Sequence, residues 1–192
     1  MSIEAMKRAA AAAAVAQVRP GMVLGLGTGS TAKHFVDALA ERMKREKFQV
    51  IGVPTSERNA EQARGLGIPL ATLEEQPRLD LAIDGADEIQ EGTLHLIKGA
   101  GGALLREKLV EAAAARLIII ADEGKLVKQL GTRFSVPVEV VRFGWRCTAQ
   151  RLRDLGCDPV PRQDGKGQPF VTDEGHYLLD CKFAPLADAA GL

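Results

Sequence analysis

The sequence predicts an α/β fold, a doubly wound and mostly parallel sheet followed by a small α+β domain with an antiparallel sheet. Over residues 1–129, short continuous apolar runs alternate with helical segments, which is typical of a parallel sheet covered by helices on both faces. Polar residues follow most of these runs directly. From Phe134 onward, extended runs and tight turns replace the alternation, so the small domain is expected over residues 130–192.

Composition narrows the class of protein. The chain has 192 residues, which suits one domain with a small appendage, and 25 basic residues balance 25 acidic ones. The basic excess of a nucleic-acid binder is therefore missing. No apolar run approaches the ~18 residues of a membrane helix, and the N-terminus does not resemble a signal peptide. Three cysteines without a CxxC spacing favour free thiols. We expect a cytoplasmic protein that binds neither nucleic acid nor membranes.

The first elements flank a glycine-rich loop. Residues 1–18 are rich in alanine, the best helix former, and predict an amphipathic helix. The apolar run at 22–24 follows a Pro-Gly turn and predicts a buried strand, and residues 32–45 have the apolar period of a helix. The loop at 25–31, Gly-Leu-Gly-Thr-Gly-Ser-Thr, therefore connects a strand to a helix.

The remaining elements follow from the same patterns. Ser56 is a suitable N-cap for a short helix that ends at Gly65. In the first domain, strands are expected at 48–53, 68–70, 79–83, 94–97 and 116–121, and helices at 57–65 and after Gly102. In the small domain, strands are expected at 136–141, from 158 and at 177–179, a helix at 148–155, and turns at 164–167 and 173–175.

Side chains able to bind a ligand follow the predicted strands. In Rossmann-like sheets, ligands bind beyond the carboxyl ends of the strands. These ends carry Thr28, Ser30, Thr31, Thr55, Ser56, Asp84, Asp87, Lys98, Asp122 and Lys125. The pattern therefore predicts a site at this edge of the sheet.

The loop at 25–31 is a candidate anion site. Backbone N–H groups at the start of a helix favour an anion. A dinucleotide fingerprint would need a third glycine where Ser30 stands, and no Gly-Lys-Ser/Thr follows to make a P-loop. Two interpretations remain: a phosphate cradle with hydroxyls from Thr28, Ser30 and Thr31, or a tight turn that binds nothing.

Asp84 and Asp87 flank Gly85 and Ala86 after a predicted strand. Two acids at this spacing could hold a metal, orient sugar hydroxyls or transfer protons. An Asx turn or a helix N-cap is an equally good interpretation. The metal interpretation is the weakest, because the three histidines are scattered and none has a metal-ligand spacing to a carboxylate.

Residues 98–108 place a lysine, a glycine turn and a helix with Glu107 in succession. This order can put a cation, backbone N–H groups and a base around one small ligand. On the helix, Leu105 and Leu109 mark the expected core stripe, and Glu107 lies roughly 160–200° from both. By that pattern Glu107 is a solvated helix charge, as most glutamates are, and Lys7 and Lys125 have the same default interpretation.

Three motifs occur in the order and spacing of one enzyme family. They are the loop at 25–31, Asp-Gly-Ala-Asp-Glu-Ile at 84–89, and Lys-Gly-x-Gly-x-x-Leu-x-Arg-Glu-Lys at 98–108. Together they closely resemble type A ribose-5-phosphate isomerases, from the first helix through Asp180. The resemblance implies interconversion of D-ribose 5-phosphate and D-ribulose 5-phosphate through an enediolate, in the non-oxidative pentose phosphate pathway, without a metal or other cofactor.

The resemblance also implies roles for individual residues. Glu107 would be the general base that moves a proton between C1 and C2, and Lys98 with the backbone of Gly99–Gly101 would stabilise the enediolate oxygen. Asp84 and Asp87 would bind sugar hydroxyls and assist ring opening. The full set of implied substrate contacts is Lys7, Thr28, Gly29, Ser30, Thr31, Asp84, Gly85, Ala86, Asp87, Lys98, Gly99, Ala100, Gly101 and Lys125, with Lys7 near the phosphate.

Two further expectations come from the resemblance. Family members are usually dimers or tetramers, so a homodimer or homotetramer is expected. The family normally continues with a Gly-Val-Val-x-x-Gly-Leu-Phe segment, which this sequence does not contain. The small domain at 130–192 is therefore expected to lack the family's C-terminal segment.

Three alternative functions occur on the same or a related fold. A non-catalytic sugar-phosphate sensor on the same fold would be joined to a DNA-binding helix pair or a basic patch, and neither is present in the sequence. An amino-sugar phosphate deaminase would use a histidine in its catalytic set, and none lies in the three motifs. An acyl-CoA transferase on a related fold was the remaining enzymatic alternative.

Overall fold

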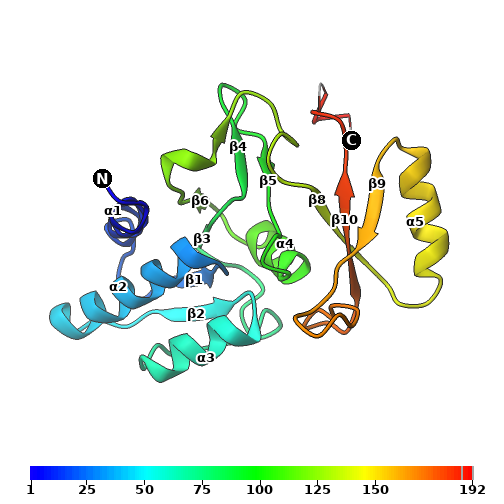
Figure 1. Cartoon of the computed structure of the whole chain (residues 1–192). Helices are drawn as coiled ribbons and strands as arrows, with labels where there is room; N and C mark the ends of the chain where they lie inside the picture. The colour runs from blue at the N-terminus through cyan, green and yellow to red at the C-terminus, as the bar shows by residue number, and fades with distance from the viewer. Residues whose placement is uncertain (187, 192) are drawn as a thin grey trace. The chain divides into compact units, whose positions relative to one another are not determined.

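The computed structural model describes residues 1–186 and 188–191, and it divides the chain into two compact units (Figure 1). The first unit comprises Met1–Gly85 and Leu105–Gly124, and the second comprises Ala86–Leu104 and Lys125–Leu192. Within the described residues no helix is long and apolar enough to cross a membrane.

The first unit contains the parallel sheet, with strand order β2-β1-β3-β6. Every pairing in it is parallel, as predicted. Its strands are β1 (Val23–Leu26), β2 (Ile51–Pro54), β3 (Leu81–Asp84) and β6 (Leu117–Ile119), and its helices are α1 (Ile3–Val15), α2 (Ser30–Glu46), α3 (Glu57–Gly65) and α4 (Leu104–Ala112).

Both faces of this sheet are buried, which confirms the doubly wound fold. Leu24 and Leu26 of β1 belong to a core shared with α1 and α2. Gly25, between them, faces the other side, where an added Cβ would lie 2.7 Å from Cγ1 of Val110 on α4. Since successive strand residues point to opposite faces, one strand thus contacts helices on both sides.

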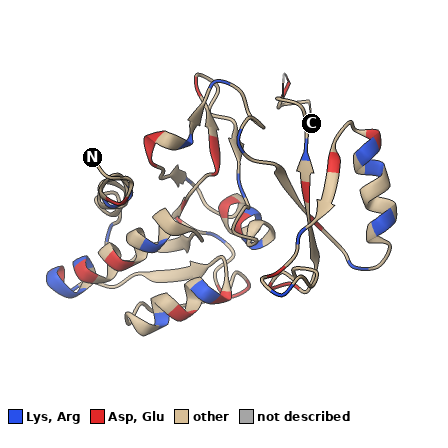
Figure 2. Cartoon of the chain, viewed as in Figure 1, with Lys and Arg blue, Asp and Glu red and all other residues tan. Residues whose placement is uncertain are grey.

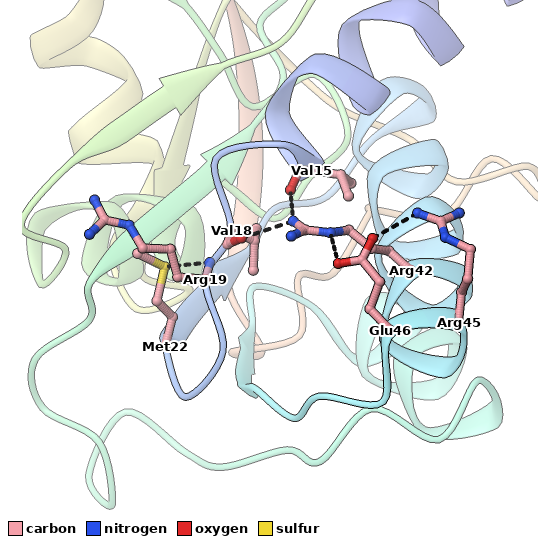
Figure 3. A network of polar contacts seen from close by, with 7 residues as sticks. All are labelled: Val15, Val18, Arg19, Met22, Arg42, Arg45 and Glu46. Carbon is pink, nitrogen blue, oxygen red and sulfur yellow. Dashed lines mark hydrogen bonds and ion pairs between the residues drawn. The ribbon is translucent and has the colours of Figure 1, made fainter.

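The end of α1 is fixed to α2 by one arginine (Figure 3). Arg42 Nη1 donates to the carbonyl oxygens of Val15 and Val18 at 2.7 and 2.8 Å, and its Nε donates to Glu46 at 2.9 Å. Arg42 thus adds a charged donor to the Val15 carbonyl at the end of α1, which also accepts the Val18 N–H at 3.1 Å, and to the Val18 carbonyl beyond the helix.

The described residues of the second unit form two three-stranded sheets and one helix. The antiparallel sheet has the order β8-β10-β9 and carries α5 on one face, as the small α+β domain was predicted to do. The other sheet, β5-β4-β7, was not predicted. The elements are β4 (Glu88–Gln90), β5 (Leu96–Ile97), the 3-10 turn η1 (Glu123–Lys125), β7 (Leu126–Val127), β8 (Val136–Val140), α5 (Trp145–Asp154), β9 (Asp158–Pro161) and β10 (Tyr177–Lys182).

Several predicted bounds differ from the structure. The strand expected at 68–70 is reduced to a single bridge between Gly52 and Leu70, and β2 begins at Ile51 instead of residue 48. Residues 86–104 and 125–129 belong to the second unit, whereas the sequence placed them before a boundary at 129. The two-domain assignment, 1–129 and 130–192, stays a prediction, and its residues 187 and 192 lie outside the described chain.

Charges of both signs are interleaved along the helices of the first unit. Figure 2 shows acidic and basic segments alternating on α2 and α3. This interleaving reflects the balanced composition of 25 basic and 25 acidic residues.

Gly25 gives a test of the packing between β1 and α4. Gly25→Ala should lower the free energy of unfolding by about 1–3 kcal/mol, because the new methyl group overpacks a filled core. Its Cβ would lie 2.7 Å from Val110 Cγ1 and 2.9 Å from Ala82 Cβ. Urea unfolding monitored by circular dichroism measures the change.

Gly65→Ala is the matched control, because nothing lies within 4 Å of its Cβ position at the end of α3. It should leave stability unchanged or raise it by about 0.5–1 kcal/mol through helix propensity. Equal stabilities for the two variants would contradict the packing described for β1.

Candidate active site

The glycine loop after β1 closely approaches the end of β3. The Gly27 N–H donates to the Ile83 carbonyl at 2.9 Å, and a Cβ at Gly27 would overlap the carboxyl group of Asp84. Only glycine allows this approach. Gly29 has φ +143° and is the N-cap of α2, so the loop leads directly into the helix whose first N–H groups favour an anion.

A cluster of buried hydroxyls supports the same loop from β2. Thr28 Oγ1 lies 2.7 Å from Thr55 Oγ1 and donates to Ser56 Oγ at 2.8 Å. Asn59, in the first turn of α3, donates to the Gly27 carbonyl at 2.8 Å. The loop is thus held by side chains from another strand end. The sequence pattern assigned no role to Asn59. Its only signal is its place three residues after the Ser56 N-cap, whose side chain accepts the Asn59 N–H.

Three loop residues expected to contact the substrate differ in exposure. Thr28 and Thr31 are buried, whereas Ser30, the first residue of α2, is exposed. The Thr28 hydroxyl is oriented by Thr55 and Ser56. A ligand at this loop would therefore meet backbone N–H groups and the Ser30 side chain.

Asp84 and Asp87 are held differently, one in each unit. Asp84 is the last residue of β3, is 1% exposed, and accepts the Gly85 N–H at 2.6 Å. Asp87 accepts the N–H of Ala100 at 2.9 Å. Asp87 therefore fixes the glycine turn that follows Lys98.

Glu107 is buried, and the predicted core stripe of α4 is wrong. Its side chain is 3% exposed, whereas Leu109, expected in the core, is 52% exposed. The inward face of α4 carries Glu107 and Val110, one helical turn apart, because Val110 packs against Gly25 of the sheet. The apolar period of this short helix thus pointed to the wrong face.

The turn after β5 contains Lys98 and the backbone N–H groups of residues 99–101. Lys98 is half-buried and Gly99 is buried. Gly99 and Gly102 have φ values of +97° and +82°, and the Gly102 N–H donates to the Gly99 carbonyl at 3.0 Å. Side chains are also excluded by packing, because a Cβ at Gly102 would lie 2.7 Å from the Phe170 ring.

Lys7 lies on α1 in a small charged group. Its ammonium contacts Glu4 at 3.1 Å, and the other Glu4 oxygen lies 2.9 Å from His34 Nε2. Hydrogen bonds from Lys7, and then from His34, lower the pKa of Glu4 below its ordinary value. The Lys7 side chain is 14% exposed, so it is not the solvated charge that its sequence position suggested.

Lys125 is positioned through a buried glutamate that sequence reasoning passed over. The Lys125 ammonium lies 4.8 Å from the centroid of the Phe134 ring. Glu88, fully buried, accepts backbone N–H groups of Gly131 at 2.7 Å, Arg133 at 2.6 Å and Phe134 at 2.9 Å. Its only signal was its place in the motif at 84–89.

The structure thus places the predicted residues in two groups. The glycine loop, Asp84 and Glu107 belong to the first unit, and Asp87, Lys98, the turn at 99–101 and Lys125 belong to the second. Among the described residues, no group of three His, Cys, Asp or Glu side chains could hold a metal ion. What the two groups offer is a buried carboxylate, a half-buried lysine and backbone donors at a helix start.

Residues 51–192 match the protein family described as ribose 5-phosphate isomerase A (phosphoriboisomerase A). A ribose-5-phosphate isomerase A from Synechococcus is 68% identical over the whole chain, which spans 83% of that protein. One from Gloeobacter violaceus is 56% identical, with the same shares of the two chains.

Solved structures agree with the sequence comparison. The ribose 5-phosphate isomerase A of Methanocaldococcus jannaschii has a TM-score of 0.93 at 41% identity, covering 97% of this chain and 83% of that one. A D-ribose-5-phosphate isomerase in complex with phospho-erythronic acid has a TM-score of 0.93 at 38% identity, covering 98% and 82%.

Glu88 gives a test of how the Lys125 segment is held. Glu88→Ala should lower the free energy of unfolding by about 3 kcal/mol, because three backbone N–H groups lose their charged acceptor. Glu88→Gln should cost less, because one amide oxygen still accepts. Urea unfolding measures both.

Glu91→Ala is the control, since Glu91 is exposed. It should change stability by no more than about 0.5 kcal/mol. A Glu88→Ala variant as stable as this control would show that the three hydrogen bonds contribute nothing to stability.

Proposed function

The chain belongs to the ribose 5-phosphate isomerase A family, and from this premise we propose how its residues act. The protein is an aldose–ketose isomerase that interconverts D-ribose 5-phosphate and D-ribulose 5-phosphate. One observation carries the assignment of the base: Glu107 is 3% exposed on a helix where its sequence position predicted a solvated charge.

The reaction needs a base and an anion stabiliser. In the aldose-to-ketose direction, a base removes the proton on C2, the electron pair forms a C1–C2 double bond, and the carbonyl oxygen on C1 becomes negative. Return of the proton to C1, with transfer of the O2 hydroxyl proton, gives the ketose. Positioned proton transfer contributes typically about 10²–10⁴-fold, and stabilisation of the oxyanion is often larger.

We assign the proton transfer to Glu107. A buried carboxylate is held in one environment by the fold and is shielded from bulk water. Burial also strengthens its interactions with charges on the substrate, because the local dielectric constant is low. An exposed glutamate at the same place in the sequence would have neither property.

We assign the stabilisation of the negative enediolate oxygen to Lys98 and to the turn at Gly99–Gly101. The ammonium supplies the charge, and backbone N–H groups supply directed donors. Asp87 already accepts the Ala100 N–H, which leaves the turn in a fixed conformation before any substrate arrives. Because one oxygen of Asp87 is used in this way, we propose that the other accepts a sugar hydroxyl.

We assign the remaining contacts to the two ends of the substrate. Asp84, with Gly85 and Ala86 beside it, binds sugar hydroxyls and takes part with Asp87 in ring opening. The loop at 28–31 binds through its N–H groups and hydroxyls. Lys7 approaches the phosphate, because it is a mostly buried cation paired with Glu4, which is 60% exposed. Lys125 is a further contact.

The assembly and the compartment are also proposals. We propose a homodimer or homotetramer and a cytoplasmic enzyme of the non-oxidative pentose phosphate pathway. The support for both is the family to which the chain belongs. We further propose that catalysis proceeds without a metal, because Lys98 and backbone donors can supply the anion stabilisation.

Glu107→Gln tests the base. The variant should lose about 10²–10⁴-fold in kcat while KM for ribose 5-phosphate stays within about threefold, because the amide keeps the shape and loses the basicity. Ribulose 5-phosphate formation by the purified chain is the measurement. Glu61→Gln, the same change at an exposed residue of α3, should be fully active. Near-normal turnover of Glu107→Gln would refute the assignment.

Lys98→Met tests the oxyanion stabiliser. It should lower kcat by about 10²–10³-fold, the usual effect of losing a donor to a developing oxyanion. Lys108→Met, at an exposed position on α4, is the matched control. A rise in KM with unchanged kcat would mean that Lys98 only holds the substrate.

A further inference from the structure

Arg162, directly after β9, contacts the same turn as Asp87. Its Nη1 donates to the Ala100 carbonyl oxygen at 2.7 Å. Arg162 and Ala100 both lie in the second unit and are 62 positions apart in the sequence. No motif and no pattern in the sequence singled out this arginine.

The rest of the Arg162 side chain is held in place. Its Nε donates to Asp180 Oδ2 at 2.9 Å, and its Nη2 pairs with the other oxygen, so the guanidinium binds Asp180 in a bidentate manner. Its Cζ lies 5.9 Å from the centroid of the Phe170 ring. Phe170 also fills the space beside Gly102. The side chain is 18% exposed.

This contact determines where a neighbouring donor points. The Ala100 carbonyl and the Gly101 N–H belong to one planar, trans peptide group and point in opposite directions. Fixing the carbonyl on Arg162 therefore fixes the N–H of Gly101. A cation on the carbonyl oxygen also polarises the peptide, which makes its N–H a stronger donor.

Two other N–H groups of the turn are already engaged. The Ala100 N–H is bound to Asp87, and the Gly102 N–H to the Gly99 carbonyl. The Gly101 N–H donates to no acceptor among the described residues, and Gly101 is exposed. Because Gly99 is buried, the exposed Gly101 N–H is the donor in this turn that a ligand can most readily reach.

We propose that Arg162 is a positioning residue for isomerisation, which aims and strengthens the Gly101 N–H toward the enediolate oxygen. The inference rests on the proposed function. Asp180 and Phe170 keep the guanidinium in place, so the small antiparallel sheet contributes to catalysis without touching the substrate.

Arg162→Met and Arg162→Lys test this role. Methionine removes the charge and every donor, whereas lysine keeps the charge and one donor nitrogen, which can reach either partner. Arg162→Met should lower kcat by about 10–100-fold, less than the loss of a direct donor, with KM for ribose 5-phosphate within about threefold. Arg162→Lys should recover part of kcat.

Binding of phospho-erythronic acid, measured by calorimetry, separates positioning from stability. Its carboxylate is negative, as the enediolate is, so it should bind more weakly to Arg162→Met by about the factor lost in kcat/KM. Binding of ribose 5-phosphate, measured in the Glu107→Gln background where turnover is slow, should hardly change. Arg151→Met, at an exposed arginine of α5, should alter none of these values.

The outcomes are distinct. Wild-type kcat in Arg162→Met, or equal loss of affinity for the acid and the sugar, would overturn the positioning role while leaving the isomerase assignment intact. If Arg162→Met unfolds, Arg162→Lys must show reduced kcat with a wild-type melting temperature, or the inference fails. A wild-type chain that neither converts ribose 5-phosphate nor binds it would overturn the proposed function as well.

Discussion

Carboxylates that accept backbone N–H groups order the loops on which this chain depends. The acidic stretch that begins at the last residue of β3 supplies three of them. Asp84 accepts from Gly85, Asp87 from Ala100, and Glu88 from three residues of the segment at 131–134. Hydrogen bonds to a charged acceptor are stronger than neutral ones, so one short segment fixes turns that lie far apart in the sequence.

Glycines make these arrangements possible by allowing close approach. Gly27 brings its loop against Asp84, and Gly25 brings β1 against Val110 of α4. The second contact turns α4 so that Glu107 faces inward with Val110. The buried carboxylate is therefore a consequence of how the sheet and helix pack, and the missing side chain at Gly25 is part of the cause.

Lysines and arginines in this chain gain their positions from neighbours that sequence patterns do not connect. Lys7 is paired with Glu4, and Lys125 lies over Phe134, which Glu88 holds. Arg162 links Asp180 to the turn after Lys98. Cations fixed in this way have already lost side-chain conformational freedom before any ligand binds.

The sequence by itself determined the fold class, because buried parallel strands are continuous apolar runs, and the family, because three motifs occur in register. It could not place Glu107: with only nine residues in α4, Leu105 and Leu109 outweighed Val110 in the pattern. It also gave no sign of Arg162 or of the β5-β4-β7 sheet, whose strands have two or three residues. Such features depend on contacts between distant segments, and only the tertiary structure decides those.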